Sequence, residues 1–232
     1  MLFGGLSLYL ANAIPEGATI SGSPTVDSGP NRTAGTRTDD GGDIITLALD
    51  LEQQTDAWKA YIGNVTGKYV LQNSNNLSIY EWPLGTSITG EVYASRTGST
   101  NFTGGAISCA SNAEMVTEQT ALGLSDSATY NINNTFNSTN HSAFSAGAGN
   151  SLAENTCRSI ALWINDTVQT PSSSAVSQEV ALHDGSMLVY AAIVNNDQKG
   201  FDNASLHDFQ LIVAENASST GTPYYFYLEL GS

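Results

Sequence analysis

The chain contains few basic residues. Its 232 residues include 7 Lys and Arg but 22 Asp and Glu, which gives a formal net charge of −15. The number of acids is ordinary for this length, so the negative charge comes from the shortage of bases. A protein that binds nucleic acid needs a basic surface to neutralise phosphates. The composition therefore argues against nucleic acid as a partner.

Residues that build catalytic and metal centres are also scarce. The three histidines, His141, His183 and His207, have different sequence neighbours, and no CxxC or Cys/His spacing indicates a zinc site. The chain has no G-x-S-x-G elbow, P-loop or dinucleotide fingerprint. We therefore predict no catalytic residue, no metal site and no cofactor, and we expect that the protein is not an enzyme.

Cysteine occurs only twice, as Cys109 and Cys157. An even count in an exported protein suggests one disulfide. A bridge across this span would constrain the unfolded chain by about 4 kcal/mol on the loop-entropy model. The alternative is a pair of buried free thiols. We expect the bridge.

The apolar stretch at residues 1–14, MLFGGLSLYLANAI, is too short to span a membrane as a helix, so we predict no transmembrane segment. Two interpretations of it stay open. Ala11-Asn12-Ala13 has the small-x-small form of a signal-peptidase site, but no Lys or Arg occurs before Arg32. The first interpretation is therefore a cleaved signal that lacks the usual positive start.

The second interpretation is a β-strand kept in the mature protein. Leu6, Leu8 and Leu10 alternate with less apolar residues, the period-2 pattern of a strand with one buried face. Residues 15–43 are rich in Pro and Gly and are expected to form a flexible linker. An apolar strand on such a tether suits a subunit that completes the sheet of a neighbour. We favour this retained strand, with the three leucines as the polymer contact.

The most informative feature that is present is the N-x-[ST] sequon. The chain contains 20 Asn and 50 Ser and Thr. If these residues were placed at random along the chain, they would form roughly four sequons, but the chain has ten. Sequons are useful on exposed turns of exported proteins, so we predict covalent N-glycans and an extracellular or cell-surface location. The expected acceptors are Asn31, Asn64, Asn76, Asn101, Asn133, Asn137, Asn140, Asn165, Asn203 and Asn216.

Residues 44–232 are expected to form one all-β domain, an antiparallel β-sandwich of about ten strands. Ser111 and Glu114 form a capping box ahead of a helical pattern, and Ser125 or Asp126 could cap a second short helix. The segment 131–151 is expected to be an exposed, sugar-bearing loop. Strand patterns occur at 44–51, 59–72, 77–82, 86–94, 105–109, 159–169, 178–183, 187–195, 208–215 and 223–230.

The aromatic residues have two possible roles. They could form a platform on which sugars stack, or they could pack in the core. The residues are Trp58, Tyr61, Tyr80, Trp82, Trp163, Tyr224, Tyr225, Phe226 and Tyr227. Because they lie mostly in strand patterns, we expect core packing.

Several segments look familiar. Residues 58–67 read WKAYIGNVTG, and later segments read YEW at 80–82, GEVYASR at 90–96 and TPYYFYLEL at 222–230. This pattern resembles a family of secreted archaeal surface proteins with a Trp-x-x-Tyr-x-Gly-Asn-Val-[Ser/Thr]-Gly core. The resemblance spans residue 45 to the end. It implies a component of the cell surface or of a filament, with no assigned catalytic activity and no site residues.

We therefore expect a structural subunit of an extracellular, glycosylated archaeal filament. Its copies would form a homopolymer head-to-tail, with the N-terminal strand of one copy added to the next. The alternative is a glycosylated cell-surface or lectin-like binding protein that does not polymerise and whose N-terminal signal is cleaved.

Overall fold

The computed structural model describes residues 14–20, 38, 40–41, 54–85, 88–147, 149–202, 204–216 and 221–231. The strand predicted at 44–51 lies outside these residues, and so does the N-terminal segment with Leu6, Leu8 and Leu10, apart from Ile14.

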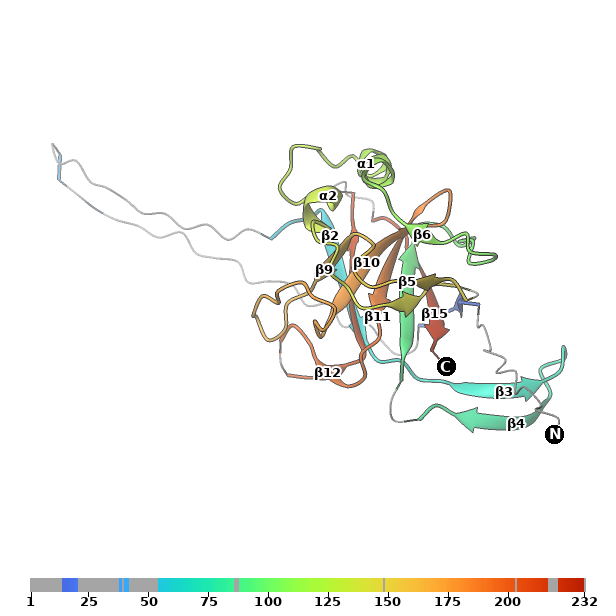
Figure 1. Cartoon of the computed structure of the whole chain (residues 1–232). Helices are drawn as coiled ribbons and strands as arrows, with labels where there is room; N and C mark the ends of the chain where they lie inside the picture. Colours follow the sequence, from blue (N-terminus) through green and yellow to red (C-terminus); the bar gives the residue numbers. More distant parts are fainter. Residues whose placement is uncertain are drawn as a thin grey trace, which may run out of the picture.

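One antiparallel sheet of seven strands organises the fold (Figure 1). Its two central strands, β10 and β11, are buried almost throughout, because both faces of the sheet are covered. The side chains of Ala181 and Tyr190 lie on one face, and those of Leu182 and Val189 lie on the other. Across the sheet the strands are β1 (Glu16–Gly17), β15 (Tyr225–Leu230), β5 (Gly90–Ser95), β11 (Leu188–Ile193), β10 (Gln178–His183) and β6 (Ser108–Cys109), and β9 (Ser159–Ala161) also pairs with β10.

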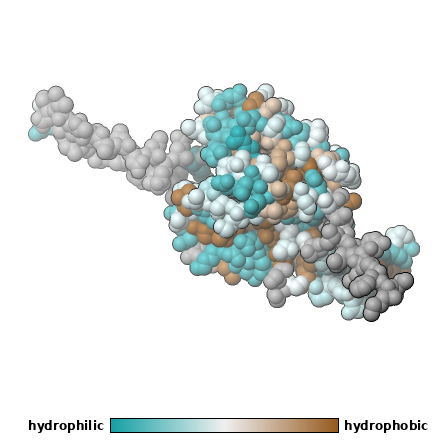
Figure 2. All heavy atoms as spheres, viewed as in Figure 1, coloured by the Kyte–Doolittle hydropathy of each residue, from teal (hydrophilic) through white to brown (hydrophobic). Residues whose placement is uncertain are grey.

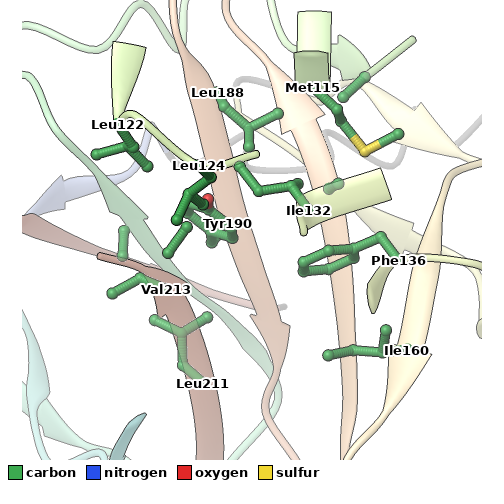
Figure 3. Packing of buried hydrophobic residues seen from close by; sticks show 14 of the residues in the cluster. Met115, Leu122, Leu124, Ile132, Phe136, Ile160, Leu188, Tyr190, Leu211 and Val213 are labelled. Carbon is green, nitrogen blue, oxygen red and sulfur yellow. The ribbon is translucent and has the colours of Figure 1, made fainter. Parts of the chain in front are cut away.

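The first face is covered by a two-stranded ribbon and two helices. The ribbon pairs β2 (Trp58–Gly63) with β14 (Phe209–Ala214), and the helices are α1 (Asn112–Ala121) and α2 (Ile132–Thr135). Figure 3 shows how side chains from these elements meet the sheet around Tyr190. The labelled residues of this core are Met115, Leu122, Leu124, Ile132, Phe136, Ile160, Leu188, Tyr190, Leu211 and Val213.

The second face is covered by loops and a short hairpin of β7 (Phe144–Ser145) and β8 (Ser151–Leu152). Phe102, Ile107 and Phe144 pack there against Tyr93, Val180 and Leu182 of the sheet. The all-β antiparallel class is therefore confirmed. The expected sandwich is not confirmed, because each face of the large sheet carries a ribbon, helices or loops instead of a second sheet of similar size.

A separate hairpin projects from this body (Figure 1). It pairs β3 (Lys68–Gln72) with β4 (Ser78–Pro83), and among the described strands these two pair only with each other. A second small ribbon joins β12 (Gln198–Lys199) to β13 (Leu206–His207).

Several predicted boundaries were wrong. The strand predicted at 59–72 is two strands, β2 and β3, because the Val65 N–H donates to Asp208 Oδ2 at 2.7 Å and the chain turns there. The strand predicted at 159–169 ends at Ala161. Asn165 and Asp166 adopt positive φ angles of 49° and 53° in a turn that a continuous strand could not contain.

The helices were predicted in part. The capping box of Ser111 and Glu114 is present at the start of α1, as expected. The second helix does not begin at Ser125 or Asp126, because the Ser125 carbonyl accepts from Ala128 N–H in a turn. It begins after Asn131, whose side chain caps the Asn134 N–H.

Two segments expected to lie apart from the folded body are part of it. Within the expected linker 15–43, Glu16–Gly17 form β1 and pair with β15. The segment 131–151, expected to be an exposed loop, buries Ile132, Phe136 and His141 among its described residues. Apolar residues spaced through this Asn- and Ser-rich segment anchor it to the sheet.

Candidate functional site

The sequon asparagines lie mainly at the surface. Eight of the ten fall among the described residues, whereas Asn31 and Asn203 do not. Asn133 and Asn216 are half-buried. The exposed ones are Asn64, Asn76, Asn101, Asn137, Asn140 and Asn165.

Local turns present several of these asparagines. Asn76 lies in the turn at the tip of the β3–β4 hairpin and has a φ of 59°, and Asn165 has a φ of 49°. Asparagine tolerates this left-handed conformation better than most residues. Asn101 Oδ1 accepts from the Thr103 N–H at 3.1 Å and from its hydroxyl at 2.7 Å. Glycan occupancy at these positions stays a prediction.

In three sequons the middle residue is buried in the protein. These residues are Val65, Phe102 and His141. His141 Nε2 accepts from the backbone N–H groups of Thr156 and Cys157, at 3.1 and 2.9 Å. Its Nδ1 lies 2.7 Å from the Ser142 carbonyl oxygen, so Nδ1 carries the proton. This histidine is a neutral, hydrogen-bonded core residue.

The predicted disulfide is confirmed. Cys109 on β6 bonds to Cys157, with the two Cα atoms 4.8 Å apart and a sequence separation of 48. Cys157 is buried on the second face of the sheet. Because both helices lie between the two cysteines, the bridge closes a loop that contains the whole helical segment.

The other two histidines occupy unrelated places. His183 Nδ1 accepts from the Gly185 N–H at 3.0 Å at the end of β10, and His207 packs against Gly200 in the β12–β13 ribbon. Within the described part of the chain, no group of three or more His, Cys, Asp or Glu side chains is placed to hold a metal ion.

Two glutamates share a buried position on the second face of the sheet. Glu91 of β5 lies directly opposite Glu229 of β15. Glu229 Oε2 accepts from the Tyr93 hydroxyl at 2.7 Å and from the Gly147 N–H at 2.8 Å. Burial, and to a lesser degree the charge of Glu229, raises the pKa of Glu91 to about 8. Glu91 is therefore protonated at neutral pH.

A second buried carboxyl lies between the sheet and the β2–β14 ribbon. Glu179 of β10 is fully buried, and its Oε2 accepts from the Ile212 N–H at 2.8 Å. Burial raises its pKa well above the ordinary value. The Glu179 carboxyl joins the two layers through one hydrogen bond.

A buried ion pair lies near α1. The Arg96 guanidinium donates to both oxygens of Glu118, at 2.5 and 2.7 Å, and Glu118 is buried. This two-pronged pair satisfies the carboxylate inside the protein. Together with the capping box, it fixes α1 against the first face of the sheet.

A cavity of about 260 Å³ opens near the ends of β10 and β11. Its polar lining includes Ser142, Gln178 and Asn195 and has no charged side chain. A serine nucleophile needs a neighbouring base, and the lining supplies none. This arrangement fits solvent better than acid–base chemistry.

The most exposed apolar surface is on the β3–β4 hairpin. Tyr69 lies opposite Trp82 and Leu71 lies opposite Tyr80, so the four side chains share one face, which we call the hairpin face. Tyr69, Leu71, Tyr80 and Trp82 are 44%, 55%, 59% and 48% exposed. The opposite face carries an ion pair between Lys68 and Glu81 at 2.6 Å. The hairpin is therefore amphipathic, and its apolar face meets solvent.

The expectation of core packing was wrong for part of the aromatic set. The residues that pack against the core are Trp58, Tyr61, Tyr224, Phe226 and Tyr227, whereas the exposed ones are Tyr80, Trp82, Trp163 and Tyr225. The alternating pattern at 77–82 correctly indicated that the two faces of this strand differ in polarity. It could not indicate how much of the apolar face stays exposed in the folded protein, where the Tyr69 hydroxyl donates to the Gly231 carbonyl at 3.5 Å.

A strand edge is a second feature suited to binding. Within the described residues, β2 pairs only with β14, so its outer edge has no strand beside it. This six-residue edge contains no proline, and its single lysine, Lys59, pairs with Glu215. Proline and free lysine are common devices that protect edges, and neither protects this one.

No family model, curated protein sequence or solved structure matches the chain. The resemblance based on residues 58–67 therefore stays a prediction. The search of the described residues for membrane-spanning helices finds none that is long and apolar enough.

Proposed function

We propose that the protein is a structural subunit of an extracellular, glycosylated filament whose copies join head-to-tail. The outer edge of β2 carries this proposal. An unprotected strand edge offers a row of backbone donors and acceptors to an incoming strand. Residues 2–14 of a neighbouring copy, which lie outside the described residues apart from Ile14, are the strand that we propose to dock there.

The leucine pattern suits this contact energetically. Burying Leu6, Leu8 and Leu10 fully would favour docking by on the order of 5–8 kcal/mol before ordering costs. Backbone pairing along β2 would fix the register, because a slip by one residue would turn the leucines outward. The donor and the acceptor are different surfaces, so the contact is heterologous and can repeat without closing.

The sequons support an extracellular place for this polymer. Six exposed acceptor asparagines are spread over turns and loops of the described surface. On the face of the molecule shown in Figure 2, hydrophobic residues lie among hydrophilic ones rather than in one continuous apolar area. Sugar on such a surface would keep a chain with few charges soluble. We propose a structural rather than a catalytic role.

Electron microscopy of the purified full-length protein tests the proposal. Wild-type protein should form fibres, and Leu8→Asp should give a folded protein that forms none. Ser7→Asp is the matched control, since it places the same charge on the opposite side of the strand and should leave fibres intact. A mature chain that begins at Ile14, or fibres formed by Leu8→Asp, would defeat the strand-addition proposal.

A lectin-like surface protein is the second candidate. The exposed rings of Tyr69, Tyr80 and Trp82 favour it, because sugars stack on exposed aromatic residues. Isolated particles in the microscope, together with saccharide binding that Trp82→Ser abolishes, would establish this candidate instead.

A further inference from the structure

The hairpin face needs a covering partner. An isolated two-stranded hairpin is marginally stable in water and gains stability when a second layer covers its apolar side. Tyr69, Leu71, Tyr80 and Trp82 lie on one side of this hairpin, and each is about half exposed. We propose that this face binds the same face of a second copy of the chain.

Charge favours a second copy as the occupant. The whole chain has a formal net charge of −15, so two copies repel each other over most of their surfaces. Residues 60–90 contain only Lys68 and Glu81 as charged residues, and these two pair with each other. The hairpin is thus a neutral part of an acidic molecule and the part where two copies approach at least electrostatic cost.

The sequons leave this face uncovered. Eight of the exposed large hydrophobic residues among those described lie within three positions of a sequon asparagine, where a glycan would shield them. The four residues of the hairpin face are not among them. Asn76 would carry its sugar at the tip of the hairpin, beyond the paired strands. The eight shielded residues are Ile62, Leu77, Ile79, Tyr130, Trp163, Val168, Phe201 and Leu206.

The surface area that two hairpin faces can bury limits the strength of the contact. Half-exposed side chains of this size offer on the order of 100 Å² each, so two hairpin faces bury about 800 Å². This area lies below the roughly 1,200 Å² at which stable specific interfaces begin, so the contact is weak and reversible.

The geometry allows the two faces to meet directly. Two hairpins stacked through their apolar sides form a small sandwich with sheets about 10 Å apart. Tyr80 and Trp82 already pack edge to face, with ring centroids 4.8 Å apart, so this part of the surface is preorganised.

The symmetry of the contact decides what it can build. A contact between identical faces closes after two copies. It cannot extend a chain of subunits, but it can join two such chains side by side. This last step rests on the proposed filament, whereas the pairing of hairpins does not.

Analytical ultracentrifugation of the full-length glycoprotein tests the pairing in the Leu8→Asp background, with wild type measured in parallel. A reversible dimer should form as the concentration rises. Leu71→Lys should weaken it about tenfold or more, because it places a charge in the centre of the face. Gln72→Lys, one residue along on the opposite face, should change the dissociation constant less than about twofold.

A second pair of variants tests whether the dimer depends on the hairpin face or on exposed apolar residues in general. Trp82→Ser should abolish the dimer, whereas Trp163→Ser should not, because Trp163 is similarly exposed but lies outside the hairpin. Circular dichroism should show unchanged folding in all four variants. For independent support, Tyr80→Cys should cross-link two copies on oxidation, and Gln72→Cys should not.

The outcomes separate the two proposals. Equal effects of Leu71→Lys and Gln72→Lys, or no dimer at millimolar concentration, would overturn hairpin pairing. Loss of the dimer after deglycosylation would also overturn it, since the face would then bind sugar. Wild-type protein that forms a dimer but no fibres would overturn the filament and leave the pairing standing.

Discussion

Replacing Glu91 with Gln should remove much of the pH dependence of folding. Glu91 is buried opposite Glu229, and burial raises its pKa from 4.5 to about 8 in the folded protein. Between these pH values the folded chain keeps a proton that the unfolded chain has lost. Stability is therefore fully present below pH 4.5 and falls as the pH rises towards 8.

The size of the effect follows from the two pKa values. Each unit of difference corresponds to about 1.4 kcal/mol, so Glu91 costs the folded state on the order of 5 kcal/mol by pH 8. Gln mimics the neutral carboxyl in size and polarity. Glu91→Gln should differ little from wild type at pH 4 and should be more stable by up to that amount at pH 8. Glu179, which is also buried, leaves a residual dependence of the same sign.

Urea unfolding at pH 4, 6 and 8, followed by tryptophan fluorescence, measures the difference. Glu154→Gln is the matched control, because Glu154 is exposed and its replacement should shift the free energy of unfolding by no more than about 0.5 kcal/mol at any pH. If Glu91→Gln and wild type lose stability in parallel from pH 4 to 8, the buried carboxyl is not the cause and the reasoning fails.

Three further predictions concern the rest of the molecule. Replacing Cys109 and Cys157 together with Ser should lower the free energy of unfolding by about 4 kcal/mol, measured by urea denaturation, because a loop of this length is no longer closed. Arg96→Ala should cost about 3 kcal/mol at neutral pH by leaving the buried Glu118 carboxylate without its partner, whereas an unchanged melting temperature would contradict this. Intact mass before and after deglycosylation should show sugar on most of the ten sequons, and three or fewer occupied sites would refute it.

The sequence predicted the elements that local chemistry determines. The strand predicted at 187–195 and the helix that follows Ser111 were found because each depends on its own residues: an apolar run in the first case and a capping box in the second. The disulfide was predicted from the even count of cysteines. These signals do not depend on the remainder of the chain.

The boundaries that failed depend on distant residues. The division between β2 and β3 results from the Asp208 carboxylate, which lies 143 positions from Val65. No local pattern contains that information. The turn at Asn165 and Asp166 was different, since two adjacent residues that tolerate positive φ were visible in the sequence.

The candidate surfaces were the least predictable part of the protein. Alternation in β4 correctly separates Tyr80 and Trp82 from Glu81, but it gives only the difference between two faces. Which face packs against the rest of the protein and which is exposed to solvent depends on the orientation of the whole hairpin relative to the large sheet. The outer edge of β2 likewise exists only because of the layer order of the complete fold.

The buried middle residues of three sequons have a consequence for biosynthesis. A glycosyltransferase that recognises an acceptor asparagine and the hydroxyl residue two positions on must also accommodate the residue between them. Val65, Phe102 and His141 are enclosed once the domain has folded. Any sugar at Asn64, Asn101 or Asn140 would therefore have to be attached while the chain is still unfolded. For these sites, glycosylation would compete in time with the folding of the sheet.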